Sequence, residues 1–243
     1  MSNEELLAEI KSRGYWRVEI HSTEYQEKRL PSRRAIQDLI NKATVSLRGW
    51  PYPYFPTEET TGKTTYDGKG LEGQVDWGYH KEYWRLYESG QWLHYLGLSG
   101  AWISREEIFK GRLPLPTQHS GYLHVRGDIL FTLTEILRFA GGLAQDGVLD
   151  PTDFLSIQLH NTRDYMLFES SGRPWFFIHE YVNPSHTPIE QSKSVPVGQL
   201  PTVIDQLALE TAIKVFEVFD WISSEAGERM LAEEQKKLIE RRL

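Results

Sequence analysis

Residues 82–96 read EYWRLYESGQWLHYL, and this stretch decides the expected fold. Two runs rich in aromatic residues, 83–87 and 92–96, flank the dipeptide Ser89-Gly90. Such runs favour strands, and a short polar dipeptide with glycine between them is typical of a tight turn. The pattern therefore predicts a β-hairpin, inside a region of strand signals that extends from residue 71 to residue 98.

Helical and strand patterns surround the hairpin. Ser2 and Glu5 form a capping box for a first helix that Gly14 can end. Further helices are predicted from residue 32, over residues 129–143 and from residue 202, and further strands over residues 15–21, 154–160, 165–168 and 175–181. The expected class is α+β, a mostly antiparallel sheet with two or three amphipathic helices packed on it.

A loose internal echo relates two parts of the chain. The pattern of the hairpin at 82–94 resembles that of residues 164–179, and a loop and an amphipathic helix follow each. The echo is compatible with two β-meander-plus-helix units. A chance match is the alternative, because the alignment needs gaps.

The domain organisation follows from length and composition. We expect residues 1–222 to form a single domain and residues 223–243 a charged C-terminal helical tail, either solvated or in contact with a partner. Residues 50–73 lack periodicity and are rich in Pro, Gly, Thr and aromatics, so they predict a long loop.

The overall composition excludes several classes of protein. The 243 residues contain no cysteine, which rules out disulfides, thiolate zinc sites and cysteine nucleophiles. The net charge of −7 limits nucleic-acid binding to a local patch. No apolar run is long enough to cross a bilayer and the first residues are acidic, so we expect a cytoplasmic protein with no membrane partner.

Short motifs for cofactors and catalysis fail in context. Residues 68–75, GKGLEGQV, match a phosphate-binding glycine pattern, but a loop precedes them and a strand follows. No complete catalytic, metal or nucleotide signature is present, so no cofactor and no metal are predicted. The acidic residues Asp153, Asp164, Glu169 and Glu180 leave a metal-dependent nuclease or another hydrolase open as an alternative.

A basic cluster at a helix start is the main candidate site. Cations there oppose the helix dipole, and an anion would relieve the conflict. Aromatic residues farther along could stack on bases. The candidate anion-binding or nucleic-acid-binding residues are Lys28, Arg29, Arg33, Arg34, Arg48, Trp50, Tyr52 and Tyr54. The alternative is that the arginines pair with Glu24, Glu27 or Asp38 and that the aromatics pack a loop onto the sheet.

Three segments carry a family resemblance. Residues 14–18 (GYWRV), residues 48–53 (RGWPYP) and the hairpin from Glu82 to Gly90 resemble uncharacterised bacterial proteins. In those proteins a similar region can precede a Schlafen-type, AlbA-like domain assigned to nucleic-acid or ATP binding. The resemblance covers mainly the first half of the chain, implies a bacterial regulatory or defence context, and transfers no catalytic residue.

Three functions follow as hypotheses. The first is a non-enzymatic binding or interaction module for a protein or nucleic-acid partner, compatible with a homodimer. The second is a nucleic-acid or nucleotide-binding protein that uses the basic helix start. The third is the hydrolase, whose site residues would be dispersed along the chain.

Overall fold

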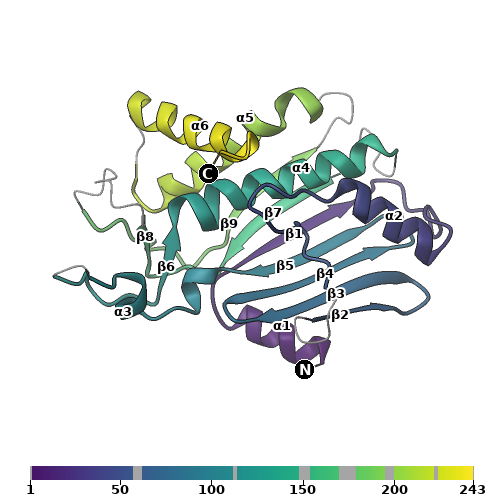
Figure 1. The fold of residues 1–243 in the computed structure, drawn as a ribbon, viewed down its shortest axis with the longest axis horizontal. Helices are drawn as coiled ribbons and strands as arrows, with labels where there is room; N and C mark the ends of the chain where they lie inside the picture. Colours follow the sequence, from purple (N-terminus) through teal and green to yellow (C-terminus); the bar gives the residue numbers. More distant parts are fainter. Residues whose placement is uncertain are drawn as a thin grey trace.

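The fold is built on one large antiparallel sheet. The computed structural model describes residues 2–56, 62–111, 114–147, 154–169, 179–194, 200–221 and 224–242. Seven strands run in the order β2-β3-β4-β5-β1-β7-β9 (Figure 1). They are β1 (Tyr15–His21), β2 (Gly62–Tyr66), β3 (Gly70–Trp77), β4 (His80–Tyr87), β5 (Trp92–Gly97), β7 (Phe154–His160) and β9 (Ile189–Ser194). The predicted α+β class is confirmed.

The predicted hairpin lies at the centre of this sheet. Strands β4 and β5 pair antiparallel from Glu82↔Leu96 to Leu86↔Trp92, and Gly90 lies in the turn between them. The predicted loop at 50–73 is wrong in its second half. Residues 62–66 form the edge strand β2, because their backbone pairs with β3 although the sequence GKTTY has no apolar alternation.

Helices α2 (Arg33–Ala43) and α4 (Thr132–Gln145) cover one face of the sheet (Figure 1). Alternate residues of the strands point toward them, among them Trp16, Trp84 and Trp92, which are 0–2% exposed. Helix α1 (Asn3–Lys11) covers part of the other face, where Leu6 and Ile10 pack against three tyrosines. Both faces are therefore buried around β4 and β5.

Helices α5 (Leu200–Val218) and α6 (Glu225–Ile239) form a further layer next to α4 (Figure 1). Within the charged tail predicted at 223–243, residues Glu225–Ile239 form α6, which packs against the protein and is not a solvated helix. Leu231 and Leu238 are fully buried, and Gln235 donates to Thr134 of α4 at 3.1 Å. Its thin apolar stripe is enough to pack the helix against the protein, because α5 and α4 supply the opposing surface. Among the described residues, no helix has the length and apolar character of a membrane span.

The predicted second hairpin lies only partly within the described residues. Strands β6 (Gly121–His124) and β8 (Tyr165–Phe168) pair in parallel outside the main sheet. An antiparallel bridge joins Met166 to Val182, and residues 170–178, where a strand and its turn were predicted, lie outside the described part of the chain. The remaining elements of the described residues are the 3-10 helical turn Ser99–Ala101, the short helix α3 (Arg105–Ile108) and the π-helical segment Val125–Phe131.

Gly73 makes room for the indole of Trp84. The two residues pair directly across β3 and β4, and a Cβ atom on Gly73 would lie 2.2 Å from the indole ring. The ring cannot yield easily, because it stacks on Trp92 at 5.7 Å and its Nε1 donates to the carbonyl of Tyr54 at 2.7 Å. The close packing against Trp84 explains why residue 73 is glycine, although Gly73 also matches the phosphate-binding glycine pattern of residues 68–75.

We expect Gly73→Ala to lower the free energy of unfolding by about 1–3 kcal/mol, as overpacked cores do. Urea denaturation measures the loss. The matched control is Thr65→Ala, an exposed position on β2, where we expect a change within about 0.5 kcal/mol. Equal losses in the two variants would show that Trp84 does not constrain Gly73.

Candidate functional site

A cleft of about 640 Å³ opens beside the β3–β4 turn. Residues from five separate parts of the chain form its wall: the segment after α2, the β3–β4 turn, the loop after β5, the start of the π-helical segment and the end of β8. The aromatic lining residues are Trp50, Tyr54, Trp77, Tyr79 and Phe168, and the polar ones are Arg48, His80, Ser99, His124 and Asp128.

Three aromatic side chains in the wall are exposed. Trp50, Trp77 and Tyr79 have exposed fractions of 47, 59 and 43%. They are three of only five large hydrophobic side chains that are exposed in the described part of the chain. Scattered exposed hydrophobic residues are ordinary, whereas several gathered on one cavity mark a binding surface.

A tight turn presents two of these rings. Trp77 ends β3, His80 begins β4, and the two residues pair across the turn. Gly78 between them has φ of +56°, which glycine adopts without strain. The Tyr79 hydroxyl donates to the carboxylate of Glu107 on α3, at 3.0 and 3.1 Å. This bond holds Tyr79 at the rim of the cleft, next to Trp77 in the same turn.

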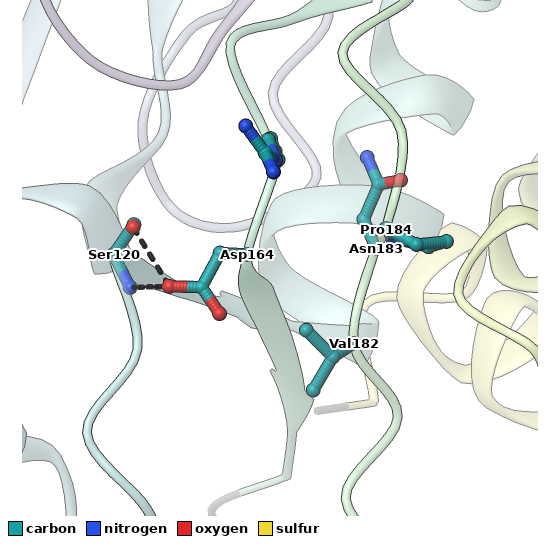
Figure 2. Close-up of a pocket in the computed structure, with 6 residues that line it drawn as sticks. Ser120, Asp164, Val182, Asn183 and Pro184 are labelled. Atoms are coloured by element: carbon teal, nitrogen blue, oxygen red, sulfur yellow. Dashed lines mark hydrogen bonds between the residues drawn. The ribbon is translucent and has the colours of Figure 1, made fainter.

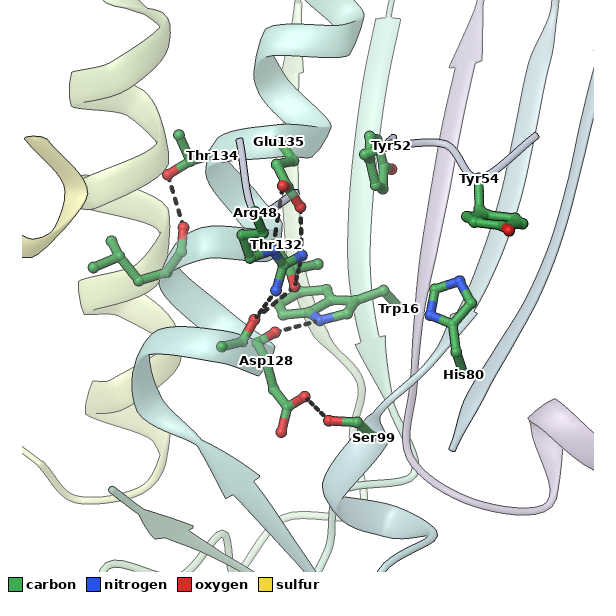
Figure 3. A network of polar contacts seen from close by, with 12 residues as sticks. Trp16, Arg48, Tyr52, Tyr54, His80, Ser99, Asp128, Thr132, Thr134 and Glu135 are labelled. Carbon is green, nitrogen blue, oxygen red and sulfur yellow. Dashed lines mark hydrogen bonds and ion pairs between the residues drawn. The ribbon is translucent and has the colours of Figure 1, made fainter. Parts of the chain in front are cut away.

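A buried ion pair supports one side of the cleft (Figure 3). The Arg48 guanidinium binds both carboxylate oxygens of Glu135 on α4, with 3.2 Å for the Nε contact, and donates to the carbonyl of Gly127 at 3.0 Å. The Glu135 side chain is fully buried, and this burial raises its pKa while Arg48 opposes the rise. Arg48 is thus neutralised within the protein, and its charge is not available to an anion.

Asp128 lies in the wall at the start of the long helix. It belongs to the π-helical segment Val125–Phe131, and such segments are frequent at functional sites. One carboxylate oxygen of Asp128 accepts from the Ser99 hydroxyl at 2.7 Å and the other from the backbone N–H of His124 at 2.9 Å. Asp128 as a whole residue is only 7% exposed, and neither of its two hydrogen-bond donors is a cation.

A second polar chain runs under the β4 side of the cleft. Glu82, 1% exposed, binds Nε2 of His80 at 2.7 Å and the backbone N–H of Tyr54 at 3.2 Å. Nε2 of buried His94 lies 3.0 Å from Glu82 without forming a hydrogen bond, and Nδ1 of His94 contacts the Tyr52 hydroxyl at 2.8 Å. Burial opposes ionisation of Glu82, but both histidines outweigh it and lower its pKa to about 2. Glu82 is therefore ionised at neutral pH.

No family model, curated protein or solved structure matches this chain. The resemblance to proteins that precede an AlbA-like domain stays a prediction. The functional argument therefore depends on the geometry of the cleft.

The structure divides the predicted site into two parts. Arg48, Trp50 and Tyr54 line the cleft, and Tyr52 is buried beneath it. The basic cluster of Lys28, Arg29, Arg33 and Arg34 lies elsewhere, because the N–H of Leu30 donates to the carbonyl of Glu88 beyond the far end of β4. That end is roughly 25 Å along the strand from His80, at about 3.3 Å per residue.

The basic cluster already has internal contacts. Arg29 donates to the carbonyl of Glu24 at 3.2 Å, and Arg34 lies 3.6 Å from Asp38 one helical turn on. Local pairing of this kind is the alternative that the sequence left open. The exposed Arg34–Asp38 pair contributes little to stability.

Sequence reasoning missed the residues that complete the cleft. Trp77, Tyr79 and His80 surround a glycine between two strands, and this aromatic turn was the available signal. Asp128 directly precedes the helix predicted over residues 129–143, and no local pattern reveals that its carboxylate accepts from Ser99 in another part of the chain.

A second hollow, of about 530 Å³, lies beside β8 and is mainly polar (Figure 2). Asp164 binds the Ser120 hydroxyl at 2.8 Å and Nδ1 of His119 at 2.9 Å, and Glu180 lies 3.4 Å from Nε2 of the same histidine. The hydrogen bond to His119 lowers the pKa of Asp164, and the hydrogen bond from the backbone N–H of Thr117 lowers the pKa of Glu180.

Of the acidic residues of the nuclease hypothesis, Asp164 and Glu180 meet at His119, but Glu169 does not join them. Glu169 binds Arg126 at 2.8 and 3.0 Å, away from the Asp164 and Glu180 pair, and Asp153 lies outside the described residues. Within the described ranges, no group of three or more acidic or histidine side chains is arranged to hold a metal ion.

Proposed function

We propose that this protein is a binding module that takes a small organic ligand into the cleft between Trp50 and Trp77. The observation that carries the proposal is the gathering of three exposed aromatic side chains on one cavity. Exposed indole and phenol rings lose contact with water when a ligand covers them, and this burial is favourable by roughly 25 cal/mol per Å² of apolar area.

The size and chemistry of the cleft fit such a ligand. Its volume of about 640 Å³ lies within the usual range for small-molecule sites. Aromatic rings share the wall with a few polar groups, those of Ser99, His80 and Asp128, and of these three Asp128 is nearly buried. The Ser99 hydroxyl donates to a carboxylate rather than to a histidine, so it is not arranged as an activated nucleophile. This arrangement favours binding over catalysis.

A nucleic-acid ligand receives less support from the cleft. Bases could stack on Trp50 and Trp77, but phosphate binding needs available cations. Arg48 is committed to Glu135, and the basic helix start lies beyond the far end of β4. Binding of oligonucleotides that weakens with salt and disappears in Arg33→Glu/Arg34→Glu would favour this second candidate instead.

We expect Trp77→Ala to abolish ligand binding while leaving the fold intact, because its ring is 59% exposed and stands at the cleft rim. Ligand-observed saturation-transfer NMR with a library of small ring compounds and amines measures binding. Tyr25→Ala is the matched control, because Tyr25 is 71% exposed and lies outside the cleft. If Trp77→Ala binds the same compounds as the native protein, the cleft is not the site.

A further inference from the structure

We infer that the ligand of the cleft is an organic cation with apolar substituents, of the alkylammonium type; this inference rests on the proposed binding function. Two independent features of the cleft converge on it. One is the set of ring faces in the wall, and the other is a buried carboxylate that has no counter-ion.

The ring faces supply the first argument. The face of an indole or phenol ring carries partial negative charge and attracts ammonium and guanidinium groups within about 6 Å. Trp50 already makes one such contact, with the Arg48 guanidinium 5.4 Å from its ring centroid. Tyr54, Trp77 and Tyr79 place further rings around the same cavity. None of these three is among the cation–π contacts that the described residues make with one another.

Asp128 supplies the second argument. Asp128 is the one carboxylate among the described lining residues, and three buried carboxylates just behind the wall have basic partners. Glu135 binds Arg48, Glu169 binds Arg126 and His124, and Glu82 binds His80. Asp128 accepts only from a hydroxyl and a backbone N–H, and no cationic side chain of the described residues pairs with it.

A nearly buried carboxylate without a counter-ion is electrostatically incomplete. Burying a charge is costly unless an opposite charge compensates for it. A cation that enters the cleft would lie between the exposed rings and Asp128, and it would supply the missing charge. A neutral ligand would leave Asp128 uncompensated, and an anion would be repelled by it.

The test compares a cation with its neutral carbon analogue. Choline and 3,3-dimethylbutan-1-ol have nearly the same shape, but only choline carries a charge. We expect isothermal titration calorimetry at pH 8 to show choline binding at least about tenfold more tightly than the alcohol. Trp77→Ala should lose choline binding, and Tyr25→Ala should retain it.

Asp128→Asn identifies the source of the preference. It keeps the shape but removes the charge: the amide oxygen can still accept from the His124 N–H, and the amide NH2 can donate to the Ser99 hydroxyl oxygen. Choline affinity should therefore fall about tenfold while affinity for the alcohol stays unchanged. If this variant does not fold, the comparison of the two ligands on the native protein still decides the matter.

The outcomes separate the two proposals. Equal affinity for choline and the alcohol would overturn the cation inference and leave the binding function intact. The same conclusion follows if neither binds while uncharged ring compounds from the library do. Absence of any ligand that depends on Trp77 would overturn both.

Discussion

Arg48→Ala is expected to lower the free energy of unfolding by about 3–5 kcal/mol, the range for removal of one partner from a buried ion pair. The variant leaves Glu135 fully buried without its cation and removes the bond to the Gly127 carbonyl. Chemical denaturation with urea measures the loss.

Two variants make the Arg48 result specific. Arg34→Ala removes an arginine whose side chain is 91% exposed, and its loss should not exceed about 0.5 kcal/mol. Arg48→Met/Glu135→Leu removes both charges, so it should recover much of the stability that Arg48→Ala loses. A double variant as unstable as Arg48→Ala would show that the cost comes from packing rather than from the unpaired carboxylate.

Acid is expected to destabilise the protein through Glu82. Its folded pKa of about 2 lies below the ordinary glutamate value of 4.5, so folding favours the ionised form. The resulting stability is fully present above pH 4.5 and is lost as the pH falls toward 2. The difference between the folded and ordinary pKa values corresponds to roughly 3 kcal/mol of unfolding free energy, at 1.36 kcal/mol per pKa unit.

The contribution of Glu82 can be isolated with Glu82→Gln, which cannot titrate. Between pH 7 and pH 3 we expect the native protein to lose about 2 kcal/mol more unfolding free energy than the variant. The difference matters because Glu169, whose pKa is also lowered to about 2, adds to the acid sensitivity of both proteins. Parallel curves of stability against pH would show that Glu82 is not held ionised by its neighbours.

Local sequence patterns predicted the elements that are specified by their own residues. The aromatic alternation at 83–96 specifies the central hairpin, and the capping box at Ser2 begins α1. The edge strand β2 escaped prediction because its pairing with β3, rather than its own residues, makes it a strand. The packing of α6 was not predicted for a related reason. Its apolar stripe is buried only because α5 and α4 lie next to it.

The cleft was predictable only in part. Trp50 and Tyr54 were predicted because aromatic residues in an aperiodic segment can bind a ligand by stacking, and Arg48 was predicted with them as a nearby cation. All three line the cleft. Their grouping with Arg33 and Arg34 relied on nearness in sequence, and the chain carries the two groups to opposite ends of β4. Asp128 and Trp77 join the site through tertiary structure alone, because they lie 51 residues apart and on different elements.

The most direct test of the central claim is a spectrum of the indole N–H groups of ¹⁵N-labelled protein, titrated with the tightest ligand of the library. The eight tryptophans give separate probes across the fold, and Trp50→Phe and Trp77→Phe assign the two signals of the cleft. We predict that the signals of Trp50 and Trp77 shift on binding, while those of buried Trp84 and Trp92 do not. Shifts confined to other tryptophans would place the ligand elsewhere and contradict the account.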